Sequence, residues 1–372
     1  MRPLSVGIIG FGRIGAEHAG WLRRAGESGG LDEISVAAIA DATAARRALA
    51  ESRGLKTCDT ASALFADPAI DAVLISTPTA MHYEQALAAL TAGKHVMIEK
   101  PMAIDLAQSQ RLVDEAGRHG LVLSVFHNRR WDRDYLTVKS AIDAGVFGRI
   151  INIESRIGQW ASCVGPAARE YRPGWRNEAA FGGGGLFDWG SHLIDQLWRL
   201  LAPARPLRVF AQLRGNVWSS DCDDFARVLI DFDNGAVGLV EINTTTTYPL
   251  PRWHIDGTAG SADSPHSDVS DINTWSQLRF KPAPAGQVEY RSTGAGMVAA
   301  GETGKTESTL LPVAQAGLSE VEIWRRFARA IRGQGEPAVT PASVLGTMAL
   351  LDAARQSSRT GQSVDVSDVA WM

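Results

Sequence analysis

Short apolar runs alternate with segments of helical apolar spacing over the first 126 residues. The runs predict strands at Ser5 to Ile9, Ile34 to Ala40, Ala72 to Ser76, His95 to Glu99 and Leu121 to Phe126. The segments between them predict helices at Ala16 to Arg24, Thr43 to Ser52, Met81 to Ala92 and Asp105 to His119. Because the runs are apolar throughout, we expect strands buried on both faces, as in a parallel sheet with crossover helices.

The pattern changes after about residue 127. A predicted helix from Tyr135 to Ala144 precedes long stretches of alternating apolar and polar residues. These stretches are Arg149 to Ile157, Leu207 to Arg214, Phe225 to Asp231 and Ala236 to Asn243, and two helices, about Leu318 to Arg332 and Pro341 to Ser358, close the chain. Asp233-Asn234-Gly235 joins two stretches and is a strong hairpin signal, which predicts an antiparallel sheet. We therefore expect two domains, residues 1–127 and 128–372.

The composition is that of an ordinary globular protein. Of 372 residues, 45% are hydrophobic and 21% are charged, and the net charge is only −4, which disfavours a nucleic-acid-binding groove. The three cysteines are far apart, so no disulfide framework or zinc site is predicted. We find no apolar run long enough to cross a membrane and no signal-like start, and we expect a cytoplasmic protein.

A glycine-rich loop follows the first predicted strand and opens the first helix. It reads Gly10-Phe11-Gly12-Arg13-Ile14-Gly15, a G-x-G-x-x-G pattern in the strand–turn–helix context that dinucleotide binding requires. In such loops the first glycine permits the tight turn, the second lets the backbone approach a pyrophosphate, and the third lets helix and strand pack closely. Residues Gly10, Gly12, Arg13, Ile14 and Gly15 are therefore candidate cofactor contacts.

Asp41 ends the second predicted strand. A carboxylate at this place accepts hydrogen bonds from the ribose hydroxyls and repels a 2′-phosphate, so NAD is favoured over NADP. Arg46 or Arg47 could weaken that preference.

Two further strand ends carry candidate residues. Glu99 and Lys100 lie at the carboxyl end of a predicted strand, the edge where ligands bind in open α/β sheets, and the following Pro101 ends the strand. Thr77 and Pro78 end the preceding strand. With His82, Thr77 and Pro78 are candidates to line the same cleft, whereas a turn with a helix cap is sufficient to explain the neighbouring Thr79.

Four glycines, residues 182–185, precede a segment with polar and apolar faces. If this segment is helical, Asp188 and His192 share one face, because they are four residues apart. A histidine beside a carboxylate is a common general acid–base pair, since the carboxylate orients the imidazole and favours its charged form. No H-E-x-x-H pattern is present, and we predict no metal site.

These motifs together resemble the glucose-fructose oxidoreductase, inositol dehydrogenase and MocA family. The resemblance rests on the glycine loop, on Glu99-Lys100-Pro101 and on the segment from Gly183 to Asp195; His127 to Trp131 and Trp175-Arg176 are softer matches. It spans nearly the whole chain. It implies an α/β fold, with an N-terminal Rossmann domain and a C-terminal α+β domain that has a large, mostly antiparallel open sheet. The open face of that sheet often mediates oligomerisation, and we expect a homodimer or homotetramer.

The resemblance also implies roles for particular residues. Lys100 corresponds to the lysine near the nicotinamide and the reacting oxygen, His192 to the proton acceptor, and Asp188 to its partner. The implied reaction transfers a hydride between NAD(P) and a secondary hydroxyl or ketone of a sugar, cyclitol or related polyol. Two alternatives remain open: a non-catalytic nucleotide- or sugar-binding regulator, and an NAD-using glycosidase.

Candidate substrate contacts come from the second half of the chain. Sugars offer C–H faces to aromatic rings and hydroxyls to charged donors, so the candidates are Trp160, Arg172, Trp175 and Arg176, with core packing as the alternative for each tryptophan. Asn128 and Arg130 follow the last strand of the first domain, where they could bind a ligand or join the domains.

Overall fold

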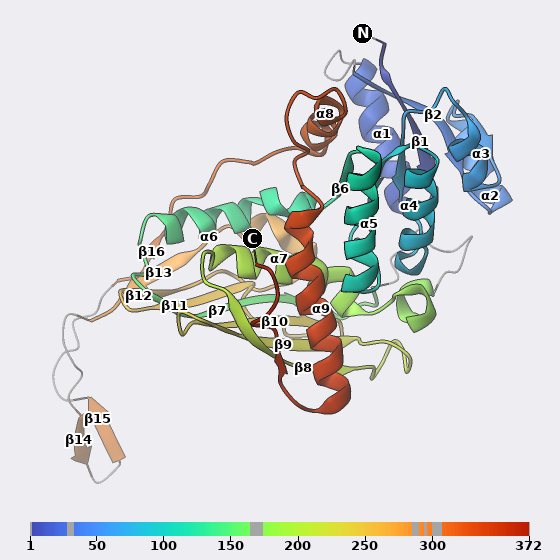
Figure 1. Cartoon of the computed structure of the whole chain (residues 1–372). Helices are drawn as coiled ribbons and strands as arrows, with labels where there is room; N and C mark the ends of the chain where they lie inside the picture. Colours follow the sequence, from blue (N-terminus) through green and yellow to red (C-terminus); the bar gives the residue numbers. More distant parts are fainter. Residues whose placement is uncertain are drawn as a thin grey trace.

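The structure is a computed structural model that describes residues 2–27, 33–163, 174–284, 290–293, 296–299 and 307–371. Two large sheets organise this part of the chain, and β14 (Tyr290–Thr293) pairs with β15 (Gly296–Ala299) in a separate hairpin. In Figure 1 the first sheet and its helices, coloured from blue to teal, lie beside the layer formed by the second sheet and its helices. None of the described helices is long and apolar enough to cross a membrane.

The N-terminal third of the chain forms a six-stranded sheet in the order β3-β2-β1-β4-β5-β6, with every neighbouring pair parallel. Its strands are β1 (Leu4–Ile9), β2 (Ile34–Ala40), β3 (Thr57–Cys58), β4 (Ala72–Ile75), β5 (His95–Ile98) and β6 (Leu123–Val125). Its helices are α1 (Arg13–Glu27), α2 (Ala44–Ser52), α3 (Ala61–Ala66), α4 (His82–Thr91) and α5 (Leu106–His119). This order is that of a Rossmann fold, which confirms the predicted class.

The strand order places the candidate motifs at one edge. The chain runs outward from β1 to β2 and β3 and then returns to β4 on the other side of β1. Ligands bind in open α/β sheets at the carboxyl ends of the strands, where the order reverses in this way. The glycine loop after β1 and the turn after β4 therefore meet at the expected binding crevice.

The second sheet has nine strands in the order β16-β13-β12-β11-β7-β10-β9-β8-β17. Neighbours are antiparallel except for the parallel pair of β10 and β7, which confirms the predicted, mostly antiparallel sheet. Its strands are β7 (Ile150–Gly158), β8 (Pro206–Arg214), β9 (Phe225–Phe232), β10 (Val237–Asn243), β11 (Trp253–Gly257), β12 (Gly260–Asp263), β13 (Arg279–Pro282), β16 (Thr309–Leu310) and β17 (Val364–Asp365). The predicted hairpin joins β9 to β10, and its Gly235 has a φ of +82°.

Helices and turns connect this sheet to the first. The helices are α6 (Arg133–Asp143), α7 (Ser191–Leu200), α8 (Glu320–Ile331) and α9 (Ala342–Thr360), and η5 (Leu186–Gly190) is a π-helical turn that leads into α7. The 3-10 turns are η1 (Thr79–Met81), η2 (Asn128–Trp131), η3 (Trp175–Asn177), η4 (Ala179–Phe181) and η6 (Val269–Thr274).

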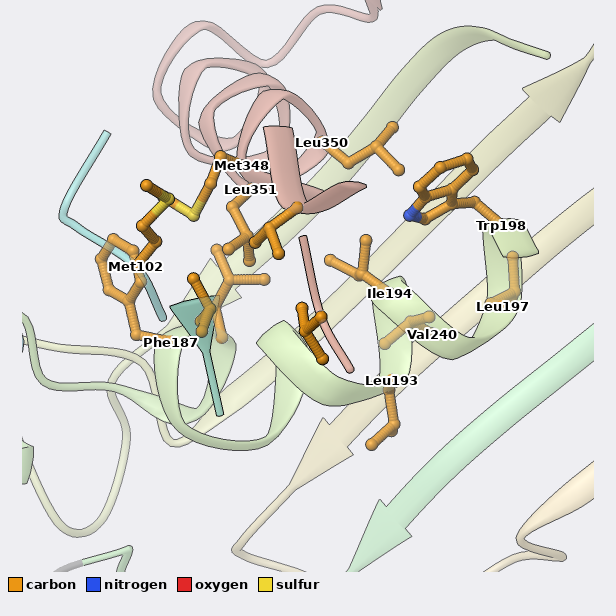
Figure 2. Close-up of a cluster of buried hydrophobic side chains, with 14 of the residues drawn as sticks. Met102, Phe187, Leu193, Ile194, Leu197, Trp198, Val240, Met348, Leu350 and Leu351 are labelled. Carbon is orange, nitrogen blue, oxygen red and sulfur yellow. The ribbon is translucent and has the colours of Figure 1, made fainter. Parts of the chain in front are cut away.

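The larger hydrophobic cluster extends from one side of the parallel sheet into the space between the nine-stranded sheet and the helices α7 and α9. Figure 2 shows side chains from all three elements in one cluster, among them Ile194 of α7, Leu351 of α9 and Val240 of β10. Along β8 the side chains alternate: Val209 is fully buried, whereas 37% of Phe210 is exposed. One face of the sheet is therefore covered by helices, and the other carries the outward side chains.

Helix α8 packs with the first sheet, although it follows all strands of the nine-stranded sheet except β17 in sequence. Its Trp324 and Phe327 belong to the hydrophobic cluster that contains Ile8 of β1 and Leu22 of α1, and Figure 1 shows α8 close to α1. A division of the chain at residue 127 remains a prediction. Helix α8 lies after residue 127 in sequence, yet it packs into the core of the first domain.

Candidate active site

A cavity of about 560 Å³ opens at the carboxyl edge of the parallel sheet. It is bounded by the loops after β1, β2, β4 and β5 and by η2, η3 and the segment from Gly182 to His192. The predicted site residues that line it are Gly10, Gly12, Arg13, Ile14, Asp41, Thr77, Pro78, His82, Glu99, Lys100, Asn128, Trp175, Arg176, Asp188 and His192. The tertiary fold thus brings most of the candidates from both halves together.

The three glycines of the loop meet three different constraints. Gly10 has a φ of +88°, a conformation that favours glycine. A Cβ at Gly12 would meet no atom within 4 Å, so this backbone faces open space in the cavity. A Cβ at Gly15 would clash with the carbonyl oxygen of Gly10, because α1 begins close to the end of β1. This matches the requirements of a loop that holds a pyrophosphate at a helix N-terminus.

Asp41 organises the next part of the cavity. Its Oδ2 accepts a hydrogen bond from the Phe11 amide at 2.7 Å, and its Oδ1 accepts one from the Thr43 amide at 2.8 Å. A carboxylate has about four acceptor positions, so both oxygens retain capacity for ribose hydroxyls. Arg46 is buried and also lines the cavity. These residues, with the glycine loop, fit the adenosine and pyrophosphate parts of a dinucleotide.

The turn after β4 is fixed by hydrogen bonds of its own. Thr77 donates from Oγ1 to Oε1 of Gln85 at 2.7 Å. His82 lies with Nδ1 2.8 Å from the Pro101 carbonyl oxygen and Nε2 3.0 Å from that of Thr77. Burial lowers the pKa of His82. His82 therefore ties the turns after β4 and β5 together, while one side of it contributes to the cavity wall.

Lys100 contacts Asp188 across the cavity. Its Nζ donates to the backbone carbonyl oxygen of Asp188 at 2.7 Å and to the carboxylate Oδ1 at 3.2 Å. Burial raises the pKa of Asp188, but the charges of Lys100 and Arg176 outweigh it, so that the pKa lies below its usual value. An ammonium group has three donors, which leaves one N–H of Lys100 for a substrate oxygen.

Asp188 lies in the π-helical turn η5, and the glycines before it allow that turn. Gly182 and Gly184 have positive φ values of +70° and +106°. A Cβ at Gly183 would collide with the backbone of Arg176. Asp223 then accepts a hydrogen bond from the Leu186 amide at 2.7 Å. The glycine run thus serves close backbone packing, and it delivers the Asp188 carbonyl to Lys100.

The predicted pairing of Asp188 with His192 is not present. Nδ1 of His192 is buried without a hydrogen-bond partner among the described residues, and Asp188 bonds to Lys100 instead. The rings nearest to His192 are those of His127, at 5.7 Å, and Trp189, at 6.4 Å between centroids. Burial lowers the pKa of His192 well below its usual value, and the charges of Lys100 and Arg129 lower it further. The structure therefore favours the neutral imidazole, not the charged form that the sequence predicted.

Two arginines stack on tryptophans at the same end of the cavity. The guanidinium of Arg176 lies 4.4 Å from the Trp175 ring centroid, and that of Arg129 lies 4.5 Å from the Trp189 ring centroid. All four residues line the cavity. Such surfaces present aromatic faces to C–H groups and guanidinium N–H groups to hydroxyls.

Three predicted substrate contacts lie elsewhere or outside the described residues. Arg130 is not among the lining residues: its guanidinium donates to both carboxylate oxygens of Asp195 at 2.7 Å and contacts Ser343, so it joins η2 to α7 and α9. Trp160 is 53% exposed and lies edge-on to Trp218, away from the cavity lining. Arg172 lies outside the described residues.

Other lining residues were missed by the sequence reasoning. Arg129, and not the predicted Arg130, lines the cavity, because successive residues of the 3-10 turn η2 point in different directions. Trp189 lies within the segment from Gly183 to Asp195, so its position in that motif was a signal for a place in the site. Trp21, Phe126 and Glu320 carry no local signal. Within the ranges that the structure describes, no group of three or more His, Cys, Asp or Glu side chains is placed to hold a metal ion.

Comparison with known protein families matches two successive segments of the chain. Residues 4–127 match the model described as "Oxidoreductase family, NAD-binding Rossmann fold". Residues 135–263 match the "GFO/IDH/MocA C-terminal domain". Together the two models match more than half of the chain.

Individual relatives agree with this assignment. The uncharacterized oxidoreductase YdgJ of Escherichia coli is 36% identical over 59% of this chain and 60% of its own length. The scyllo-inositol 2-dehydrogenase (NADP(+)) IolW of Bacillus subtilis is 27% identical over 80% of this chain and 79% of its own length. Among solved structures, an NAD-binding protein from Listeria innocua is 29% identical, with a TM-score of 0.83 over 98% of this chain and 100% of that one.

Proposed function

Because the chain belongs to the GFO/IDH/MocA family of NAD(P)-dependent oxidoreductases, we propose that it interconverts a secondary hydroxyl and a ketone on a sugar, cyclitol or related polyol. The observation that carries this proposal is the placement of Lys100, next to Asp188 and in the same cavity as the glycine loop and His192. A cationic donor and a neutral base thus lie together beside a dinucleotide-binding loop.

Lys100 is the electrostatic group of the proposed reaction. Two of its donors bond to Asp188, which fixes the ammonium in the cavity. The third donates to the substrate oxygen and stabilises the negative charge that develops as the hydroxyl loses its proton. Preorganised donors of this kind lower the barrier most in sites that exclude water.

His192 is the proposed proton acceptor. Its Nδ1 is buried, which leaves Nε2 as the nitrogen that can serve the cavity. Its pKa lies well below the usual value because of burial and the charges of Lys100 and Arg129, so the imidazole is neutral near pH 7 and free to accept a proton. Asp188 acts through Lys100 in this scheme, not through the imidazole.

The nicotinamide cofactor supplies hydride transfer when bound. The glycine loop and Arg13 would hold its pyrophosphate, and Asp41 its adenosine ribose. The carboxylate of Asp41 supports a preference for NAD, even though the name of one relative specifies NADP(+).

The walls of the cavity and the name of a relative support the proposed substrate class. Trp175 and Trp189 offer aromatic faces, and their stacked arginines offer N–H donors, a combination that suits a ring with several hydroxyls. The name of the B. subtilis relative specifies a cyclitol.

The test is a panel of sugars and cyclitols assayed for NADH or NADPH absorbance with the purified protein. We expect net NADH formation with at least one cyclic polyol. Cleavage of a chromogenic glycoside without net NADH would favour the glycosidase alternative instead. NADH binding without turnover of any panel member or glycoside would favour a regulator.

A further inference from the structure

A chain of buried hydrogen bonds connects helix α8 to the backbone of Lys100. Nε1 of Trp324 donates to Nδ1 of His18 at 3.0 Å, and Nε2 of His18 lies 2.9 Å from Oε1 of Glu99. Oε2 of Glu99 accepts from the Lys100 amide at 3.1 Å. Trp324, His18 and Glu99 are all buried.

We propose that His18, held in one tautomer by Trp324, is a positioning residue that fixes Lys100 through Glu99. This proposal rests on the proposed function for its effect on turnover, but the hydrogen-bond chain itself can be tested without a substrate. It gives α8, more than 200 residues away in sequence, a direct influence on the reacting group.

The donors and acceptors in this series of hydrogen bonds allow only one tautomer of His18. The indole N–H of Trp324 only donates, so Nδ1 of His18 must accept and carries no proton. A neutral imidazole then carries its proton on Nε2, which donates to Glu99. Rings on several sides hold the imidazole in place: the centroids of Trp21 and Phe126 lie 4.8 and 4.4 Å from that of His18.

Glu99 connects His18 to the backbone of Lys100 at the end of β5. Burial raises its pKa, but the hydrogen bonds from His18 and from the Lys100 amide, with the charge of Lys100, outweigh it, and the pKa lies below its usual value. The carboxylate therefore stays ionised and accepts on both oxygens. His82 holds the Pro101 carbonyl on the other side of Lys100. The backbone of Lys100 is thus fixed from both sides, with its side chain directed at Asp188.

The substitution Glu99→Gln should place two hydrogen-bond donors opposite each other in this series of hydrogen bonds. An amide has one oxygen and one NH2 group, and the Lys100 amide requires the oxygen. The NH2 group then faces the N–H of His18, so two donors meet. His18 cannot change tautomer, because an N–H at Nδ1 would face the indole N–H of Trp324.

Trp324→Phe removes the indole N–H and should relieve this conflict. In the double variant His18 can carry its proton on Nδ1 and accept from Gln at position 99. We expect Glu99→Gln to lower kcat about 100-fold with little change in NADH affinity, because a small misplacement of a reacting group has effects of that size. Adding Trp324→Phe should recover about tenfold in kcat.

The matched control is Phe327→Leu, which removes buried aromatic volume beside Trp324 on the same helix but removes no donor or acceptor of the hydrogen-bond chain. It should give no recovery when combined with Glu99→Gln, and thermal melting should show that the variants are folded. Equal recovery with Phe327→Leu, or no recovery with Trp324→Phe, would overturn the proposal.

Nuclear magnetic resonance gives a readout that needs no substrate. In protein with 15N-labelled histidine and lysine, His18 should be protonated on Nε2 only, and this pattern should reverse in the double variant. Exchange of the Lys100 amide should be slow in the wild type, about tenfold or more faster with Glu99→Gln, and slow again in the double variant. Protonation of wild-type His18 on Nδ1 would contradict the proposed hydrogen bonds, and so would a Lys100 amide whose exchange rate is the same in Glu99→Gln. Both results can be obtained even if no polyol is turned over.

Discussion

The ammonium of Lys100 bonds to Asp188 twice, at 2.7 Å to its backbone carbonyl oxygen and at 3.2 Å to its carboxylate. One partner ends a strand of the parallel sheet, and the other lies in the turn before α7 of the second half. This contact therefore links the two sheets' elements at the wall of the cavity, and it makes Lys100 the first residue to test.

Lys100→Met should lower kcat for NAD-dependent polyol oxidation about 100- to 1,000-fold, because the variant loses the donor for the developing alkoxide. NADH affinity, measured by fluorescence titration, should change little. The control is Lys139→Met, which removes a surface lysine paired with Asp143. Retained turnover in Lys100→Met would rule out the proposed role of the ammonium.

The pH dependence of kcat/KM should reflect the lowered pKa of His192. A histidine with the ordinary pKa of about 6.5 loses activity as a base below that value. Burial and the charges of Lys100 and Arg129 lower the pKa of His192, so the acid limb should lie well below pH 6.5. Arg129→Gln removes one of these charges, raises the pKa and should move the limb to higher pH. Arg118→Gln, at an exposed helical pair, should leave it unmoved; a limb at pH 6.5 in the wild type would contradict the neutral, buried imidazole.

Asp41 should decide the choice between NAD and NADP. The wild type should prefer NAD, because the carboxylate repels a 2′-phosphate. Asp41→Asn removes the charge and keeps an acceptor for the Phe11 amide, and it should reduce the NAD/NADP ratio of kcat/KM about tenfold or more. Asp59→Asn is the control, since Asp59 also lines the cavity. An unchanged ratio in Asp41→Asn would assign the preference to other residues.

Asp223 should make stability depend on pH. Burial raises its pKa to about 6. The folded chain therefore binds a proton more tightly than the unfolded chain, and the contribution of Asp223 to stability falls as pH rises from about 4 to about 6. Asp223→Asn keeps an acceptor for the Leu186 amide and avoids this loss, which amounts to about 3 kcal/mol for two pKa units. Thermal melting at pH 4.5 and pH 8 should show a larger gain of the variant over the wild type at the higher pH, whereas exposed Asp143→Asn should show no such difference.

The outward face of the nine-stranded sheet should carry a self-association interface. Phe210, Leu229 and Leu239 lie opposite one another on β8, β9 and β10 and form an apolar row, in which Phe210 is 37% and Leu229 36% exposed. Leu229→Asp should convert a dimer or tetramer to a smaller species in light scattering. Val313→Asp, at another exposed apolar residue, should not. A wild-type protein that is monomeric at all concentrations would contradict this prediction.

Local patterns were sufficient for the first domain and for its binding edge. Continuous apolar runs separated by helical segments require a parallel sheet, and each strand end then falls on the same edge. The glycine loop, Asp41 and Lys100 all lie at strand ends, so their meeting place follows from the topology alone. The short β3 and α3 were missed, because two to six residues give little periodic signal.

The choice between neighbouring residues could not be made in this way. Arg129 and Arg130 are adjacent and chemically alike, yet one lines the cavity and the other binds Asp195. Which of the two faces the cavity depends on the orientation of η2 relative to α7, and no sequence spacing contains that orientation.

The sequence by itself determined the Rossmann domain and its nucleotide loop, because these follow from short-range periodicity and from motifs at strand ends. That Lys100, Asp188 and His192 share one site was implied by the resemblance to a known family. Only the tertiary structure decided that Asp188 pairs with Lys100 instead of His192, and that α8 returns to the first core to contact His18. Both contacts join segments separated by dozens to hundreds of residues, and the packing of two sheets sets their geometry.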